Sequence, residues 1–409
     1  MNESVRDLLA KPAFVLYFTV QLKESLKEIR SLSSEFAQIP SQRIHAYIEM
    51  FTSVEEILLG KTYVDSHRIT RQPIGRILFK SPSNYSPAYA DVYLLIHRSG
   101  AALLEVWCPA PVQPFNAIEW NKGLDFSVKD SLMTQIFRAL APFIQEIEGK
   151  DTWSGYSFPV TIVRLPKHSL EAIGADYKED IVHLLFMDRS QLPIRPEIID
   201  EVLSNNFCMR KGGLVLLSRQ SGIDLHGKED PAEELLHSDL PPRSSLPFLI
   251  TLELLLLERT VLQRFYDELL RSELRSVEEL MTLKQRVLDD LEEYYGAITS
   301  ANRFTDAVIS EGERLLGITD LYDAVVDRIE TISFVITTHY QKRMTDLQFW
   351  LTVIISAIEI GFIVMSFATW YYQPGPMTVL LALAWTIGAS ILAGAILIVT
   401  LWKNLKHPS

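Results

Sequence analysis

The sequence predicts an α+β domain, a long helical stalk after it and a C-terminal two-helix transmembrane hairpin. Three features lead to this prediction. Strand and helix patterns are interspersed before residue 240, an unbroken helical pattern begins near Thr319, and two long apolar runs lie near the end of the chain. Hairpins with helices between them favour an α+β domain with a largely antiparallel or mixed sheet.

The first region, residues 1–240, contains the patterns from which the α+β domain is predicted. Apolar runs and turn residues predict strands at Ala13–Gln21, Asp91–Arg98, Ala102–Trp107, Phe158–Leu165, Ile181–Met187, Phe207–Arg210 and Leu214–Ser218. Helical periodicity predicts helices at Leu22–Phe36, Ile44–Leu59 and Lys129–Gly149. Two of the strand pairs are expected to form antiparallel hairpins, across the turns at residues 99–100 and 211–213.

A linker and a helical hairpin region, residues 241–318, are expected next. The stretch Ser221–Ser245 is rich in Gly, Pro, Ser and charge and reads as a linker. Leu246–Leu274 is apolar enough to pack against neighbouring helices, but its most apolar part is too short to span a bilayer. A capping-box match at Ser276–Glu279 predicts a new helix, which Gly317 ends near residue 316.

The membrane hairpin is predicted from two runs of apolar residues. A stalk helix at 319–372 continues into the first span, where Glu359 is the single charge after Leu347. A turn at 373–376 follows, and the second span at 377–402 carries no charge. Each run exceeds the about 20 residues that a helix needs to cross the hydrocarbon core. Backbone groups in lipid must be satisfied within the segment, so both runs are expected to be helical.

Charges beside the two runs predict the topology. Lys342 and Arg343 precede the first span, while Lys403 and Lys406 lie in a basic tail at 403–409. Basic residues favour the cytoplasmic side, and the turn between the spans has no charge. The chain is therefore expected to be a multi-pass protein of the cell membrane (inner or plasma membrane), with both termini in the cytoplasm. No signal peptide is predicted at the N-terminus.

One face of the first span is polar. At 100° per residue, one row of side chains falls within about 80°. Its members are Gln341, Thr345, Gln348, Thr352, Ser356, Glu359, Ile363 and Ser366. Hydroxyls in membrane helices often only hold helices together, and Glu359 could be protonated against the second span. The continuation of the row toward the cytosol favours the other interpretation, a hydrated axis that several copies of the helix share.

Composition and motifs argue against several other functions. The net charge is −12 and no basic patch is evident, which argues against nucleic-acid binding. Only Cys108 and Cys208 are present, as suits a reducing compartment. No phosphate loop, dinucleotide fingerprint, nucleophile elbow or zinc motif is found, so neither an enzyme nor a bound cofactor is expected.

In this layout the chain resembles the CorA-type divalent-cation transporters, which include the ZntB-like proteins. The resemblance is architectural and strongest from about Thr319 to Ser409. It implies a homopentamer in the lipid bilayer, with the first span around the pore and divalent cations as substrate or regulator. That family carries Gly-Met-Asn in the outward turn, which here contains Tyr371, Tyr372, Gln373, Pro374 and Gly375. The resemblance therefore does not imply selectivity for Mg²⁺.

These observations lead to the hypothesis of an oligomeric membrane protein that conducts cations. In this hypothesis Glu359 attracts cations and Ile363 forms a hydrophobic constriction. Pore oxygens come from Thr352, Ser356 and Ser366, and the cytosolic end is lined by Gln341, Thr345 and Gln348. The alternative is a non-conducting, membrane-anchored scaffold or sensor whose cytosolic domain binds a partner. An enzyme on a membrane anchor is a third alternative.

Overall fold

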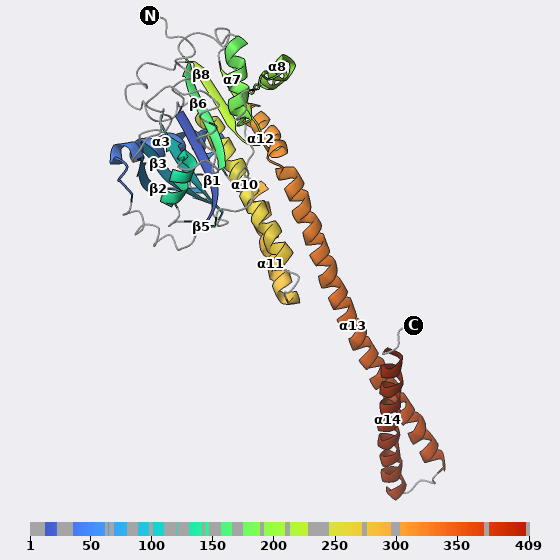
Figure 1. The fold of residues 1–409 in the computed structure, drawn as a ribbon. Helices are drawn as coiled ribbons and strands as arrows, with labels where there is room; N and C mark the ends of the chain where they lie inside the picture. The colour runs from blue at the N-terminus through green and yellow to red at the C-terminus, as the bar shows by residue number, and fades with distance from the viewer. Residues whose placement is uncertain are drawn as a thin grey trace, which may run out of the picture. The chain divides into compact units, whose positions relative to one another are not determined.

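The computed structural model shows a domain of mixed sheet and helices, followed by long helices (Figure 1). It describes residues 13–22, 36–61, 64, 69–79, 89–97, 101–109, 121, 131–140, 144–146, 157–165, 175–188, 192–208, 213–227, 245–271, 276–295, 303–371 and 376–405. The chain divides into two compact units. The first comprises Met1–Glu273 and Gln285–Arg328, and the second comprises Leu274–Lys284 and Ile329–Ser409.

An eight-stranded mixed sheet forms the centre of the first unit. Its strands are β1 (Ala13–Leu22), β2 (Ile69–Leu78), β3 (Tyr89–His97), β4 (Ala102–Cys108), β5 (Ile144–Glu146), β6 (Ser157–Leu165), β7 (Leu214–Leu217) and β8 (Gly222–Gly227). They lie in the order β2-β3-β4-β1-β6-β8-β7, with β5 paired to β1. The β6–β8 pair is parallel and the other described pairs are antiparallel, which confirms the predicted α+β class with a mixed sheet.

Helices cover the sheet and continue from it toward the C-terminus. They are α3 (Ser41–Leu59), α6 (Leu132–Leu140), α7 (Ala175–Leu185), α8 (Pro196–Ser204), α10 (Leu246–Leu270), α11 (Val277–Tyr295), α12 (Arg303–Leu315), α13 (Ile318–Tyr371) and α14 (Pro376–Leu405). The strand β1 shows how the sheet separates two layers of helices. Phe14, Leu16 and Phe18 join the hydrophobic core that includes α6 and α7. Tyr17 points the other way, toward α10, because successive side chains of a strand face opposite sides.

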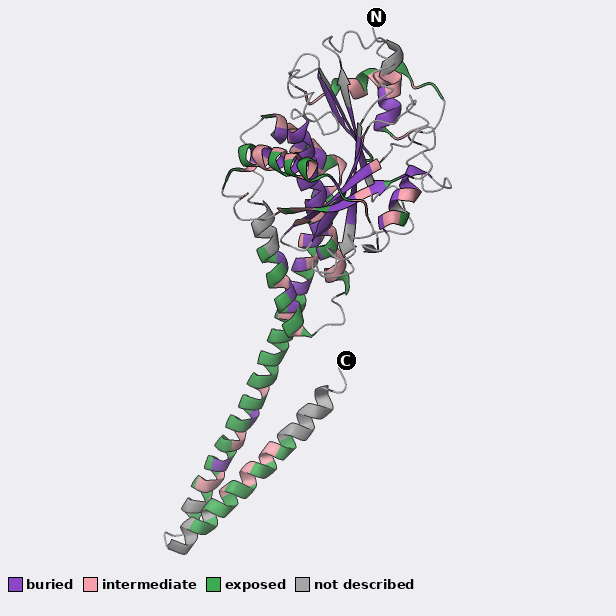
Figure 2. Cartoon of the chain, turned by 90° about the vertical axis from the view of Figure 1, so that its left-hand side faces the viewer, coloured by how far each residue is buried: buried purple, intermediate pink, exposed green. Residues whose placement is uncertain are grey.

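Helix α10 is the most deeply buried helix of the first unit. Nearly every residue from Leu246 to Val261 is buried, and Figure 2 shows it purple over most of its length. It packs against α3, α12 and the strands β1 and β4. A helix that is enclosed on all sides is expected to be apolar on all sides. This explains the run of leucines, which was expected to pack against neighbouring helices and which also packs against strands of the sheet.

Several predicted elements are confirmed. Strands Ala13–Gln21, Asp91–Arg98, Ala102–Trp107 and Phe158–Leu165 correspond to β1, β3, β4 and β6, and the helix Ile44–Leu59 lies within α3. The β3–β4 pair is the predicted antiparallel hairpin. Of the predicted helix Leu22–Phe36, residues 23–35 lie outside the described part of the chain.

Two predictions of secondary structure are wrong. Ile181–Met187 is not a strand, since it lies mostly within α7. Ile181, Leu184 and Leu185 face the core at helical spacing, which a short apolar run does not reveal by itself. The predicted helix Lys129–Gly149 is also wrong in extent: α6 spans only Leu132–Leu140, and β5 follows. The sequence has proline at position 142, a residue that disfavours the interior of a helix.

The second predicted hairpin is described only in part: the Phe207 N–H donates to the Val215 carbonyl oxygen at 3.0 Å, while its turn lies outside the described residues. The strand Leu214–Ser218 exists as β7, but its antiparallel partner is β8, which lies at the start of the predicted linker. Residues 207–208 form no strand, and residues 209–212 and 228–244 lie outside the described part. The strand β2 was not predicted, because Pro73 and Gly75 are atypical of strands. They lie at a bulge in its pairing with β3, where Gly75 has a φ of 154°.

The helices that follow agree in part with the prediction. Ser276 and Glu279 form the predicted capping box: each backbone N–H donates to the other side chain, at 3.0 and 3.3 Å. The helix that begins there ends at Tyr295, earlier than expected, and α12 begins at Arg303. Gly317 has a φ of 67° and separates α12 from α13 as predicted. Helix α13 then runs without interruption for 54 residues.

Candidate functional site

The later part of α13 carries large apolar side chains that are exposed among the described residues. Trp350, Leu351, Ile354, Phe362 and Phe367 are all exposed, and Figure 2 shows this stretch largely green. Exposed apolar surface on this scale marks a membrane or protein contact. Within the described residues one helix, at Ile318–Phe367, is long and apolar enough to cross a membrane. A shorter apolar stretch, Leu383–Ile396, lies in α14.

The predicted polar row lies on α13, and we call it the polar face. It consists of Gln341, Thr345, Gln348, Thr352, Ser356, Glu359, Ile363 and Ser366. Ser356 is half-buried and the other seven side chains are exposed. The single helix therefore brings these residues to one side, and no other described element of the chain covers them.

Three hydroxyl groups of the polar face donate hydrogen bonds within their own helix. The hydroxyls of Thr345, Thr352 and Ser366 donate to the carbonyl oxygens four residues earlier, at 2.8–2.9 Å. A hydroxyl has one proton and two lone pairs. With the proton directed at the helix, the lone pairs remain as acceptors. Such oxygens suit a cation, which needs acceptors and no donors.

Glu359 is the one charged residue of the predicted first span. Its side chain is exposed and forms no ion pair with any described residue. An ionised side chain at the centre of a bilayer costs about 2.5–3.5 kcal/mol on insertion scales. A partner outside this single chain, or water, is therefore required if α13 spans a membrane.

Helix α14 contacts α13 on the side away from the polar face. A Cβ atom added to Gly361 would overlap Ser390 Oγ and lie 3.2 Å from Thr386 Cγ2. Gly361 is two residues after Glu359, which is about 200° around the helix. Small residues at such a crossing allow close approach of two membrane helices. Helix α14 therefore does not neutralise or cover Glu359.

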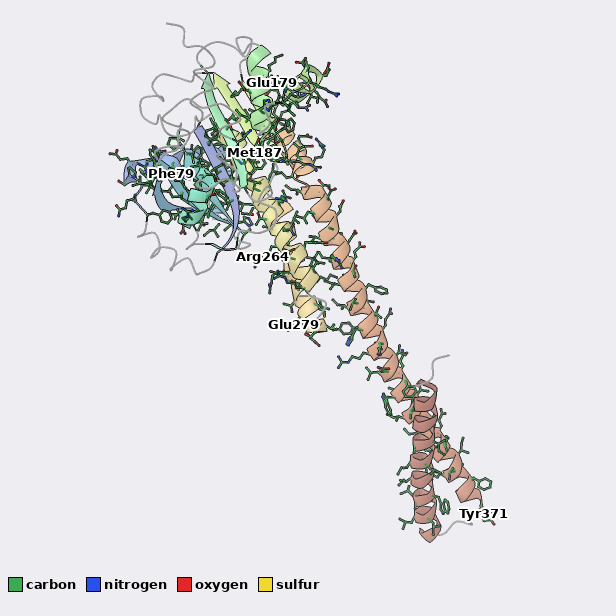
Figure 3. All side chains as sticks on the ribbon, in the orientation of Figure 1. Phe79, Glu179, Met187, Arg264, Glu279 and Tyr371 are labelled. Carbon is green, nitrogen blue, oxygen red and sulfur yellow. The ribbon has the colours of Figure 1, made fainter. Side chains whose placement is uncertain are left out.

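The predicted outward turn is described only at its edge. Tyr371 is the last residue of α13 and is exposed; it is labelled in Figure 3. Tyr372, Gln373, Pro374 and Gly375 lie outside the described residues.

A buried group of charges between the sheet and two helices was not predicted from the sequence. The Arg71 guanidinium on β2 lies 2.7 Å from Glu55 on α3 and 3.6 Å from Glu105 on β4, and also pairs with Glu253 on α10. Its guanidinium lies over the Phe51 ring at 4.1 Å. Glu105 and Glu253 are each the only charge in an apolar run, which is the sequence signal that could have indicated this group.

Electrostatics shows how this buried group is held. Burial raises the pKa of Glu105, and the charge of Glu253 raises it further, while Arg71 lowers it. Burial raises the pKa of Glu253 as well. Burial alone would lower the pKa of Arg71, yet the surrounding carboxylates raise it. Arg71 therefore stays charged and joins four elements of the first unit, which is a structural role.

A second buried acid lies between α10 and α12. Glu258 is only 3% exposed, and its Oε2 atom has no hydrogen-bond partner among the described residues. Burial, and then the nearby charge of Glu313 on α12, raises the pKa of Glu258 to about 7. This carboxyl group consequently changes its charge near neutral pH.

Neither a cluster of possible metal ligands nor a similar protein points to another functional site. Among the described residues, no group of three or more His, Cys, Asp or Glu side chains is placed to hold a metal ion. No family model, curated protein or solved structure matches the chain. The polar face of α13 is therefore the candidate functional site.

Proposed function

We propose that several copies of this chain form a membrane channel or transporter that passes cations between their α13 helices. The polar face is the observation that carries this proposal. It combines a carboxylate with outward lone pairs of hydroxyl oxygens, and from Leu347 to Phe367 the other exposed residues of the helix are apolar. Rings of carboxylates and oxygen ligands are what cation pores use to replace water around an ion.

The position of α14 supports a shared axis. Since α14 packs near Gly361, the polar face is left for contact with other copies of α13. In this arrangement Glu359 would form a ring of carboxylates and attract cations. Ile363, one turn further on, would form a hydrophobic constriction. Both termini face the cytoplasm of a two-span protein in this proposal, and five copies follow the resemblance to the CorA type.

The non-conducting anchor is a second candidate, and one observation favours it. Because Thr345, Thr352 and Ser366 already donate to their own helix, these hydroxyls can also lie in a dry contact. In that case Glu359 would be neutral and hydrogen-bonded within a packed interface. The two candidates therefore differ in whether the Glu359 carboxyl group affects ion movement.

The test is cation flux into liposomes that contain the full-length protein. Fluorescent indicators inside the vesicles would report K⁺ and Mg²⁺ separately. We expect flux above that of empty vesicles, and a reduction of tenfold or more in Glu359→Gln. The matched control is Glu330→Gln, which removes an exposed carboxylate from the same helix outside the predicted span. Equal flux in wild type and Glu359→Gln, or no flux in either, would refute conduction through the polar face.

A further inference from the structure

A pocket of about 500 Å³ lies in the first unit, and none of its lining residues belongs to the polar face. Its walls come from the end of α7, from α8, from β7 and the turn after it, and from the last turn of α12. Pockets that bind small molecules usually enclose about 300–1,000 Å³. The size is therefore that of a site for a small organic ligand.

The interior of this pocket is apolar, and its opening has an exposed aromatic ring. Leu185, Leu216 and Leu217 are buried and form part of the lining, while Phe186 is 43% exposed. Phe186 precedes Met187, a non-glycine residue with a φ of 51° in the turn after α7, which is labelled in Figure 3 and is not one of the residues that line the pocket. Residues in this left-handed region cost free energy and occur more often at functional sites.

A rigid turn places a positive charge at the same pocket. The Ser218 hydroxyl accepts hydrogen bonds from the backbone N–H groups of Gln220 and Ser221, at 3.1 and 3.0 Å. It also donates a hydrogen bond to the Leu185 carbonyl oxygen at 2.8 Å. Arg219 lies within this turn and lines the pocket. Its exposed guanidinium forms no ion pair with any residue that the structure describes. The hydrogen bonds hold the backbone of this turn, which places the Arg219 guanidinium beside the pocket.

The second arginine of the pocket is already occupied. Arg314 pairs with Glu311 on the exposed side of α12. The charges that line the pocket thus sum to one positive charge, from Arg219. Guanidinium groups bind carboxylates through paired, charge-assisted hydrogen bonds. A ligand with a cationic group would be repelled, and one without charge would leave Arg219 unused.

From this combination we infer that the pocket binds a small amphipathic acid, with its apolar body against the leucines and its carboxylate on Arg219. The site also adjoins the beginning of the long helix. Leu315 lines the pocket in the last turn of α12, and Gly317 then joins α12 to α13. A bound acid is therefore placed to alter the direction of the last turn of α12, and a regulatory effect of this kind rests on the proposed conduction.

Binding can be tested by calorimetry on the full-length protein in nanodiscs of zwitterionic lipid, with empty nanodiscs subtracted. The probes are 2-naphthoate, 2-naphthalenemethanol and 2-naphthylmethylammonium, which share one apolar body. Charge-assisted hydrogen bonds contribute roughly 1.5–3 kcal/mol. We therefore expect the acid to bind at least tenfold more tightly than the alcohol, and the ammonium not to bind.

Three variants identify the site. Arg219→Gln should reduce the affinity for the acid to that for the alcohol, and Val202→Phe should abolish both by filling the pocket. Arg303→Gln, which removes an exposed arginine from α12 away from the pocket, should have no effect. A melting temperature within a few degrees of wild type would show that each variant folds. No binding of the acid to wild type, or unchanged binding in Val202→Phe, would overturn the assignment.

The regulatory part has its own readout. Saturating 2-naphthoate should change cation flux at least twofold in wild-type liposomes and not in Val202→Phe liposomes. Binding without a change in flux would refute the coupling. Absence of any flux would refute the proposed conduction and leave the calorimetric result as it stands.

Discussion

Replacement of Glu258 by glutamine should remove a specific part of the pH dependence of stability. Its carboxyl group is buried between α10 and α12, and its pKa is raised from 4.5 to about 7. The folded protein therefore holds a proton there between about pH 4.5 and pH 7, while the unfolded chain has released it. When the folded state binds more protons, the free energy of unfolding falls as the pH rises.

The size of this effect follows from the difference between the two pKa values. One pKa unit corresponds to about 1.4 kcal/mol, so the wild type should lose about 2 to 3 kcal/mol between pH 5 and pH 8 through this group. Above the pKa that Glu258 has in the folded protein, this group should cause no further loss in the free energy of unfolding. In a domain of 150–250 residues, about 2 to 3 kcal/mol corresponds to roughly 5–10 °C in melting temperature.

The assay is thermal unfolding of the full-length protein in detergent, followed by tryptophan fluorescence. Trp107 on β4 is buried in the sheet and reports on the first unit. The wild type should lose roughly 5–10 °C in melting temperature between pH 5 and pH 8 through this group, and Glu258→Gln should not show this loss. The melting temperature of Glu258→Gln minus that of wild type should therefore be roughly 5–10 °C larger at pH 8 than at pH 5. The control Glu201→Gln, at an exposed position of α8, should show no such gain. If the melting temperatures of wild type and Glu258→Gln differ by the same amount at pH 5 and at pH 8, the reasoning is refuted.

Two further predictions concern packing. Arg71→Gln leaves two buried carboxylates, Glu105 and Glu253, and the half-buried Glu55 without their cation, and should destabilise the first unit by about 3–5 kcal/mol; urea unfolding measures this, and a loss below about 1 kcal/mol would contradict it. The Cβ of Ala357 lies 3.8 Å from a Cβ added to Gly394, so cysteines at both positions should form a disulfide on oxidation. Adding Gly361→Leu should prevent that disulfide and Gly388→Leu should not, because a Cβ at Gly388 meets nothing within 4 Å; equal cross-linking in both would show that α14 does not pack near Gly361.

Much of the fold could be predicted because local patterns specify it. The strands β1, β3 and β4 are apolar runs with turn residues between them, and α13 has no proline or glycine that would end it before Gly361. The helix α7 could not be recognised, since the run Ile181–Met187 is too short for its periodicity to decide. The strand β2 was hidden because its bulge at Gly75 requires residues that strands usually avoid.

The candidate site could be located on the sequence but not completed from it. Spacing alone places Thr352, Ser356 and Glu359 on one side of a helix, as the structure also has them. What they face depends on neighbouring copies of α13, which are not specified by local pattern. The Arg71 group and the pocket beside Arg219 arise from contacts between elements far apart in the chain, which periodicity does not encode.

The most direct test of the central claim is the rate at which cysteines on α13 react with a water-soluble cationic thiol reagent. Ser356→Cys lies on the polar face, and Ile354→Cys lies two residues earlier, on the opposite side at nearly the same depth. Both would be made with Cys208→Ala; Cys108 can remain, because it is fully buried and burial raises the pKa of its thiol.

In liposomes we expect Ser356→Cys to react at least tenfold faster than Ile354→Cys, and its modification to reduce cation flux. Equal rates, or faster reaction of Ile354→Cys, would show that the polar face does not line a hydrated path.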